Sequence, residues 1–293
     1  MNKEEKESTE KTEQKPLGPP KSTLREYLES FIVTLVMALF GMTFVLQAVT
    51  VPTGSMQNTI LIGDYLLVNK FIFAPGGNPL PFMPQREIER GDIIVFKFPG
   101  YPNSLKKTKI EIEQAGVPYQ TNFVKRVIGL PGDKVEIRGN EVYINDQLLP
   151  EHRVIGDSEN EDSALETKEF EPRQPNQNYD VYYAEQAIKG KVTERDYPFA
   201  GQGKPYTVPE NSYFVMGDSR NRSLDSRYWG VVSRDLVVGR AMFVYWSCDR
   251  GAAGDSMLGC LTHPRLNRIV FLPAERAPEE AMTRAANGRK EWP

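Results

Sequence analysis

The longest uncharged stretch of this chain lies between Glu29 and Asp64. Within it, residues 31–49 read FIVTLVMALFGMTFVLQAV and are almost wholly apolar. Nineteen helical residues span about 28 Å, close to the hydrocarbon thickness of a bilayer. A buried core helix rarely lacks polar positions for so long, and a cleavable signal peptide normally has a small residue where Leu46 stands. The stretch therefore predicts a transmembrane anchor helix, which we place at residues 29–50.

The charges that flank this span predict its orientation. Lys15, Lys21 and Arg25 precede it, and no Lys or Arg follows it until Lys70. By the positive-inside rule, the N-terminus lies in the cytoplasm and the chain beyond the span lies outside. Residues 1–28 open on a run rich in Lys, Glu, Thr, Gln and Pro, which predicts a disordered cytoplasmic tail. We therefore expect a single-pass protein of the inner or plasma membrane.

The chain beyond the span has the pattern of a β protein, and we assign residues 51–273 to one extracytoplasmic β domain. Its apolar segments are rich in Val, Ile, Phe and Tyr and are separated by Gly, Pro and Asn clusters. None of them alternates with a helix-length pattern, which argues against a parallel α/β fold. The expected strands are 61–73, 92–98, 122–129, 134–138, 141–145, 213–216 and 236–246.

Two regions depart from this pattern. Residues 151–185 contain ten acids against three bases, and we interpret about 150–205 as a solvated insertion in the β domain. Residues 274–293 show no clear burial pattern and are expected to form a C-terminal tail.

Composition narrows the class of function. The formal net charge is −3 and no Lys/Arg run stands out, so we expect no nucleic-acid partner. The only two histidines, His152 and His263, do not lie at metal-ligand spacing from Cys, Asp or Glu, so we expect no metal and no cofactor. Cys248 and Cys260 could close a loop worth about 3 kcal/mol in an oxidising compartment, or remain two unpaired thiols.

The first segment that contains a candidate catalytic residue is Pro52-Thr53-Gly54-Ser55-Met56, just beyond the span. A serine after a glycine is common in loops and means little by itself. Its position gives it weight, because a nucleophile this close to the bilayer surface would meet membrane-embedded substrates.

The second segment is FVKRVIGLPGD, which begins at Phe123. On a strand, Lys125 and Arg126 point to opposite faces, so we expect one of them to be drawn to the packed side. The bland interpretation is a lysine that extends along an edge strand towards solvent. The functional one is a desolvated lysine, whose pKa burial lowers, so that its neutral amine can take the proton from a serine hydroxyl.

The third segment, MGDSRNRSLDSRYWG, begins at Met216 and is dense in hydrogen-bonding groups. It could be a polar surface turn with a salt bridge between Asp225 and Arg227. It could instead be a loop that packs beside the lysine and orients its amine.

These three segments, in this order and after an N-terminal anchor, resemble the conserved boxes of the bacterial type I signal peptidases, from about residue 25 to about residue 245. The resemblance implies Ser55 as nucleophile and Lys125 as general base. It also implies that Thr53, where the family commonly has Ser, joins the Ser55 N–H in the oxyanion hole. Ser223 matches the residue that hydrogen-bonds the lysine.

Among the other positions of the third segment, two match the family pattern and three differ from it. Asp225 and Arg227 match a structural ion pair of the family. Ser219, Asn221 and Arg222 depart from the commoner Asn, Asp and Asn, which puts only local loop contacts in doubt.

The resemblance implies a mixed β fold with a small insertion domain. The implied activity is that of a membrane-bound serine endopeptidase, which cuts signal peptides from exported preproteins after small residues in an Ala-X-Ala pattern. The implied partners are secreted preproteins, membrane lipid and, functionally, the export machinery. The apolar residues around the substrate are expected to be Val51, Pro52, Met56, Ile60, Phe123 and Val124, although they could equally be ordinary core.

Two rival functions stay open at this point. A self-cleaving repressor-type Ser–Lys protease would share the dyad, but the anchor and the lack of a helix-turn-helix argue against it. A catalytically silent, membrane-tethered β module that binds exported proteins would not need an intact Ser and Lys. Labelling by a serine-directed acylating inhibitor would separate these possibilities, since a silent module would not label.

Overall fold

A computed structural model describes residues 22–73, 84–101, 121–157, 164–188, 197–253, 257–270 and 272. It divides into two units, residues 1–42 and 43–293. Most of the expected cytoplasmic tail and the expected C-terminal tail at 274–293 lie outside the described residues.

The described part of the N-terminal unit, from residue 22 onward, is helical. Helix α1 (Thr23–Phe40) begins after Ser22, whose hydroxyl accepts a hydrogen bond from the Arg25 N–H and so satisfies one free donor of the first turn. It continues into a π-helical turn, η1 (Gly41–Val45). The stretch Thr23–Val45 is long and apolar enough to cross a membrane.

The helix ends earlier than expected. Residues 46–50, which we assigned to the anchor, form strand β1 (Leu46–Thr50), paired antiparallel with β2 (Asp64–Asn69) from Leu46↔Asn69 to Thr50↔Tyr65. The β-branched Val49 and Thr50 suit a pleated strand, and pairing in register outweighs the apolar continuity of the sequence.

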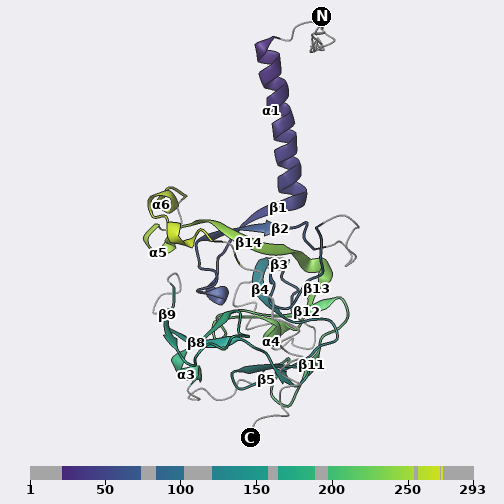
Figure 1. Cartoon of the computed structure of the whole chain (residues 1–293), viewed down its shortest axis with the longest axis vertical. Helices are drawn as coiled ribbons and strands as arrows, with labels where there is room; N and C mark the ends of the chain where they lie inside the picture. Colours follow the sequence, from purple (N-terminus) through teal and green to yellow (C-terminus); the bar gives the residue numbers. More distant parts are fainter. Residues whose placement is uncertain are drawn as a thin grey trace, which may run out of the picture. The chain divides into compact units, whose positions relative to one another are not determined.

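The main sheet has seven strands in the order β1-β2-β14-β3-β4-β12-β13, and each neighbouring pair is antiparallel. The long strand β14 lies between β2 and β3 (Figure 1). Short helical turns connect several of its strands. The elements of this part of the chain are η2 (Gly54–Met56), β3 (Ile93–Lys97), β4 (Asn122–Gly129), β12 (Ser212–Met216), α4 (Ser226–Trp229), β13 (Val232–Ser233), η5 (Arg234–Leu236) and β14 (Val237–Ser247).

A second, four-stranded antiparallel sheet has the order β11-β5-β6-β7, with β5 (Lys134–Arg138), β6 (Glu141–Ile144), β7 (Gln147–Leu148) and β11 (Tyr206–Thr207). Its buried face shares one apolar cluster with Ile128 of β4 and with Phe214 and Met216 of β12. The two sheets thus cover a common core, and the mainly β, antiparallel fold that we predicted is confirmed.

The acidic insertion is folded rather than merely solvated. It contains a three-stranded sheet in the order β10-β8-β9, with β8 (His152–Asp157), β9 (Glu166–Glu169) and β10 (Asp180–Tyr183), followed by α3 (Glu185–Ile188). Strands β10 and β8 are parallel. Its acids are exposed on β9, whereas Val181, Tyr182 and Tyr183 of β10 are buried. Charge counting alone did not reveal this small core.

The C-terminal part of the described chain is joined to the main sheet by a disulfide and by hydrogen bonds. Cys248 and Cys260 form a disulfide, so of our two alternatives the unpaired thiols are wrong. The Leu272 N–H donates to the Met242 carbonyl, and the Val244 N–H donates to the Val270 carbonyl. The elements of this part are α5 (Arg250–Ala253), α6 (Met257–Thr262) and η6 (Leu266–Arg268).

Candidate active site

Ser55 lies in the short 3₁₀ turn η2, just after the edge strand β1, and is 7% exposed. The chain before the turn is fixed by hydrogen bonds between Val51 and the start of β2: the Val51 N–H donates to the Asp64 carbonyl, and the Gly63 N–H donates to the Val51 carbonyl. The Ser55 carbonyl accepts a hydrogen bond from the Ser219 N–H at 3.1 Å. The serine is therefore held by its backbone, with its hydroxyl left for other contacts.

Lys125 comes from strand β4 and is 3% exposed. Its Nζ donates to Ser55 Oγ at 2.5 Å and to the Val124 carbonyl at 3.0 Å. Burial lowers the pKa of the amine to about 8, a shift that Asp225 and Asp218 oppose and Arg227 reinforces. A substantial neutral fraction near neutral pH is what a lysine base requires.

Arg126 is also buried, at 1% exposed, which corrects our expectation that only one of the two basic residues faces the packed side. Every residue of β4 from Lys125 to Gly129 is buried, so this part of the strand offers neither face to solvent. The guanidinium forms a bidentate ion pair with Asp218, with N–O distances of 2.8 and 2.7 Å, and stacks on the Tyr179 ring. This pairing neutralises the second charge beside the candidate base.

Residues 217–225, which we call the catalytic loop, pack beside the two candidate residues. Ser223 was expected to bond the lysine amine, but its hydroxyl donates to Asp225 Oδ2 at 2.6 Å. Asp225 also pairs with Arg227 at 2.7 Å, the ion pair that the sequence suggested. Although burial raises the pKa of Asp225, Arg227 and the hydrogen bonds from Ser223 and Gly217 hold it below its ordinary value. The hydroxyl oxygen keeps its lone pairs as acceptors, so this bond does not exclude the contact with Lys125 that the resemblance implies.

Gly217 packs closely against the backbone of the nucleophile. A Cβ at this position would lie 2.4 Å from the Ser55 carbonyl oxygen and 2.3 Å from Ser223 Oγ, so no side chain fits. Its N–H donates to Asp225 Oδ2 at 3.0 Å.

The other residues predicted for the site fall into three groups. Thr53 and Pro52 are exposed, and the Thr53 hydroxyl makes no capping bond to the turn that follows it. Phe123 and Val124 are half-buried. The remaining three are packed inside one apolar cluster and present almost no surface: Val51, Met56 and Ile60, at 4%, 1% and 0% exposed. The packing of these three residues is that of ordinary core residues and not of residues that line a pocket.

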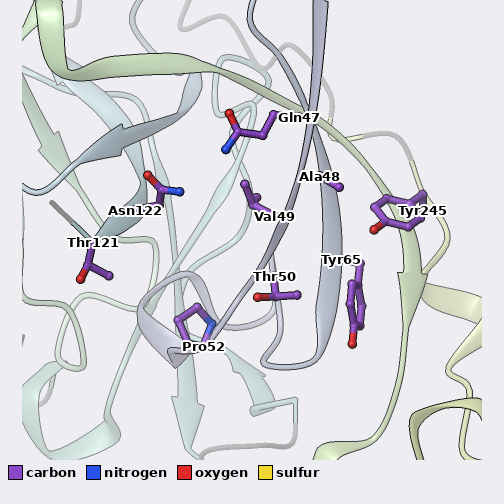
Figure 2. Close-up of a pocket in the computed structure, with 9 residues that line it drawn as sticks. All are labelled: Gln47, Ala48, Val49, Thr50, Pro52, Tyr65, Thr121, Asn122 and Tyr245. Carbon is purple, nitrogen blue, oxygen red and sulfur yellow. The ribbon is translucent and has the colours of Figure 1, made fainter. Parts of the chain in front are cut away.

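An open pocket of about 490 Å³ lies beside the nucleophile segment (Figure 2). Thr121 and Asn122, at the start of β4, form one side, and β1 with Pro52 forms the other. Figure 2 shows Gln47 and Val49 of β1 on the side nearer to Asn122. The full lining is Gln47, Ala48, Val49, Thr50, Pro52, Tyr65, Thr121, Asn122 and Tyr245.

Both walls of this pocket are strand edges. Strand β1 is the last strand of its sheet, and in the part of the chain that the structure describes it pairs only with β2. Strand β4 pairs with β3 from Asn122 to Arg126, whereas its pairing with β12 covers Arg126 to Gly129. One edge of residues 122–125 therefore lacks a described neighbouring strand, and the pocket can accept an extended peptide.

Sequence reasoning missed Asp218 and Glu151 as parts of this site. Asp218 accepts hydrogen bonds from the Arg126 guanidinium and, at 2.7 Å, from the Thr59 hydroxyl. It therefore joins β4 to the chain that follows the nucleophile. A weak signal was present, since Asp218 follows directly on an apolar strand. Glu151 gave no such signal, because it lies 69 residues from its partner Arg220.

A serine hydroxyl in hydrogen-bonding contact with a buried, partly neutral lysine amine is the arrangement of a Ser–Lys serine protease. The comparisons place the chain more narrowly. The family model described as signal peptidase, peptidase S26, matches residues 24–246. The chain belongs to this family.

Curated relatives agree with this placement. A signal peptidase I of Rickettsia typhi is 32% identical over 77% of this chain and 81% of that protein. A signal peptidase I of Pseudomonas aeruginosa is 32% identical over 76% and 73%. A probable signal peptidase I-2 of Synechocystis sp. is 28% identical over 82% and 81%.

Proposed function

We propose that Ser55 is the nucleophile and Lys125 the general base of this signal peptidase. The chain is a serine endopeptidase of the type I signal peptidase class, which removes signal peptides from preproteins. The observation that carries the residue assignment is the 2.5 Å contact between Lys125 Nζ and Ser55 Oγ in a water-poor environment.

The chemistry follows from that contact. The neutral amine takes the proton of the Ser55 hydroxyl as its oxygen attacks the scissile carbonyl, and the resulting ammonium then protonates the leaving amine. The mature protein departs, and the signal peptide stays as an ester on Ser55. The neutral amine then activates a water that hydrolyses this ester, which restores both residues.

The negative oxygen of the tetrahedral intermediate needs hydrogen-bond donors. We assign the Ser55 N–H and the Thr53 hydroxyl to this role. The exposure of Thr53 leaves its hydroxyl accessible to a substrate, and it makes no capping bond that would have to be broken. A good donor of this kind is worth about 3–4 kcal/mol in the transition state.

The substrate would bind as an added strand between the two edges that line the pocket of Figure 2. Main-chain hydrogen bonds to β1 and to residues 122–125 would supply affinity, and shallow side-chain pockets would supply specificity. Val49, Pro52, Phe123 and Val124 are accessible enough to line such pockets. Val51, Met56 and Ile60 would not contact the substrate. Their packing beneath the pockets would limit how deep the pockets are.

The proposed specificity is for small residues before the cut. A shallow pocket rejects a large side chain by clash, whereas each missing methylene forfeits only about 1–3 kcal/mol. The test is a set of preproteins with Ala, Ser, Leu or Phe at the residue before the cut, incubated with the purified chain in detergent. We expect efficient cleavage after Ala and none after Phe. Efficient cleavage after Phe or Leu would contradict the shallow pocket and leave the dyad untouched.

The membrane arrangement is part of the same proposal. The relatives are signal peptidases, and among the residues that the structure describes one N-terminal apolar helix is long enough to span a bilayer. We assign a single pass with a cytoplasmic N-terminus, lipid around the helix, and a functional link to the export machinery. The active site would then meet signal peptides at the extracytoplasmic surface of the membrane that the helix spans.

A further inference from the structure

The insertion sheet continues into the catalytic loop. Strand β10 pairs with β8 on one side. On its other side, the Tyr182 N–H donates to the Asp218 carbonyl at 2.8 Å, and the Arg220 N–H donates to the Tyr182 carbonyl at 2.9 Å. The Ala184 N–H adds a bond to Asn221 Oδ1 at 2.9 Å. The loop therefore lies along the edge of the insertion sheet, joined to it by an isolated parallel β-bridge between Tyr182 and Ser219.

A buried ion pair reinforces this junction. Arg220 forms a bidentate pair with Glu151, the residue that precedes β8; Arg220 Nη1 lies 2.6 Å from Glu151 Oε1, and Nη2 contacts Oε2. The two side chains are 0% and 3% exposed. A buried ion pair is weak evidence for stability, because desolvation offsets its attraction. What the pair does fix is the position of the guanidinium.

The guanidinium reaches the residue that touches the nucleophile. Arg220 Nε donates to the Gly217 carbonyl at 3.2 Å, while the Gly217 N–H is held by Asp225. Gly217 in turn lies against the Ser55 carbonyl, too close for any side chain. A continuous set of contacts thus runs from the insertion through Arg220 and Gly217 to Ser55.

We propose that Glu151 is a positioning residue for catalysis: by holding Arg220 on the Gly217 carbonyl, it keeps Ser55 in line with Lys125. This inference rests on the dyad proposed above. Loss of the carboxylate frees the guanidinium to leave Gly217 and loosens the backbone around Ser55. The pocket that would bind substrate contains none of these residues, so the effect should fall on turnover and spare substrate binding.

The chain offers a matched control. Arg153 and Glu171 form another bidentate pair within the same insertion, at 3.0 and 2.8 Å, and neither residue has a described contact with the catalytic loop. Glu171→Gln therefore removes a comparable carboxylate from the same module. Glu151→Asp keeps the charge of the original residue but withdraws it by one methylene.

The experiment measures kcat and KM for preprotein cleavage by purified full-length Glu151→Gln, Glu151→Asp and Glu171→Gln. Active sites are counted with a serine-directed acylating inhibitor. A small misplacement of reacting groups can cost about 100-fold in rate, so we expect kcat of Glu151→Gln to fall about 10- to 100-fold while KM stays within about twofold. Glu151→Asp should recover part of this loss, and Glu171→Gln should match the wild type.

Two results would overturn the inference. One is a Glu151→Gln enzyme that melts at a lower temperature but turns over normally per active site, which would make Glu151 merely structural. The other applies if Glu151→Gln fails to fold: wild-type kcat in Arg220→Lys, which keeps the charge but loses the Nε–H that bonds the Gly217 carbonyl, would then exclude a positioning role. Ser55→Ala is assayed in parallel, because residual cleavage by that variant would mean that the dyad assignment itself is wrong.

Discussion

Lys125 Nζ and Ser55 Oγ lie 2.5 Å apart although the two residues are separated by 70 positions in the chain. The contact depends on the order of strands, because β4 carries the lysine inside the main sheet while β1 and β2, at its edge, hold the turn that carries the serine. Ser219 and Gly217 then fix the serine backbone from the other side. A buried amine at this distance makes several measurable consequences follow.

The first consequence concerns pH. Burial lowers the pKa of Lys125 to about 8, and the working base is the neutral amine. Activity should therefore rise about tenfold per pH unit below this value and level off above it. The measurement is kcat/KM for a preprotein between pH 6 and 10. A flat profile, or one that falls from pH 6 upwards, would exclude a lysine base.

Stability gives an independent check on the same pKa. The ordinary value is 10.5, so between about pH 8 and 10.5 the unfolded chain binds this proton and the folded chain does not. Stability therefore rises with pH through that window, and below it the folded state bears a cost of about 3 kcal/mol. Lys125→Met lacks this cost. We expect the variant to be more stable than the wild type at pH 7, and the difference to shrink by pH 10.

The second prediction concerns Arg126. Because Arg126 points away from Lys125 on the strand, Arg126→Met should affect the chemistry only mildly. The structure adds a larger effect on stability, since the variant leaves Asp218 buried without its partner, which typically costs about 3–5 kcal/mol. Arg153→Met, in a half-exposed pair, should cost about 1 kcal/mol or less. Urea unfolding of both variants decides the matter, and equal losses would contradict it.

The third prediction concerns Gly217. An alanine there would place its methyl group within 2.4 Å of the Ser55 carbonyl and 2.3 Å of Ser223 Oγ, so the loop or the serine must move. A shift of this size should lower kcat about 100-fold. Gly132→Ala is the control for a glycine-to-alanine change without a clash, because nothing lies within 4 Å of a Cβ added there. Comparable activity losses in both variants would mean that the contact at Gly217 is not the cause.

Several strands were predictable because local patterns mark them, whereas the Ser55 and Lys125 assignments came from the resemblance of their segments to a known family. The strands at Asn122–Gly129 and Lys134–Arg138 have the predicted bounds, since turn residues delimit alternating apolar runs there. Ser55 and Lys125 stand in segments that resemble the family boxes. The end of the anchor was wrong by about five residues, because β1 is as apolar as the helix before it and only its pairing with β2 identifies it as a strand.

The rest depended on contacts between distant residues. A serine hydroxyl can bond either an amine or a carboxylate. Only the folded loop shows that Asp225, two residues away, accepts a hydrogen bond from the Ser223 hydroxyl. Met56 and Ile60 have the side chains of a pocket wall, yet the packing of the sheet places them in the core. Glu151 and Arg220 gave no sequence signal at all, because a buried ion pair is recognised only once both partners are placed.

The fourth prediction concerns orientation. A cysteine introduced within residues 1–20 should resist a membrane-impermeant thiol reagent added to spheroplasts, and Lys168→Cys, on the exposed strand β9, should react. The native cysteines are paired in a disulfide and should not interfere. Both introduced cysteines should label after permeabilisation. Protection of Lys168→Cys together with labelling of the N-terminal position would reverse the proposed topology.

The central claim is that Ser55 and Lys125 carry out the cleavage, and preprotein processing by single variants tests it most directly. Purified wild type, Ser55→Ala and Lys125→Met are incubated in detergent with one preprotein at pH 9, after circular dichroism has shown that all three are folded. We expect the wild type to release the mature protein and each variant to lose at least about 1,000-fold in rate. Near-normal processing by Lys125→Met would contradict the assignment of the base, and near-normal processing by Ser55→Ala would contradict the account as a whole.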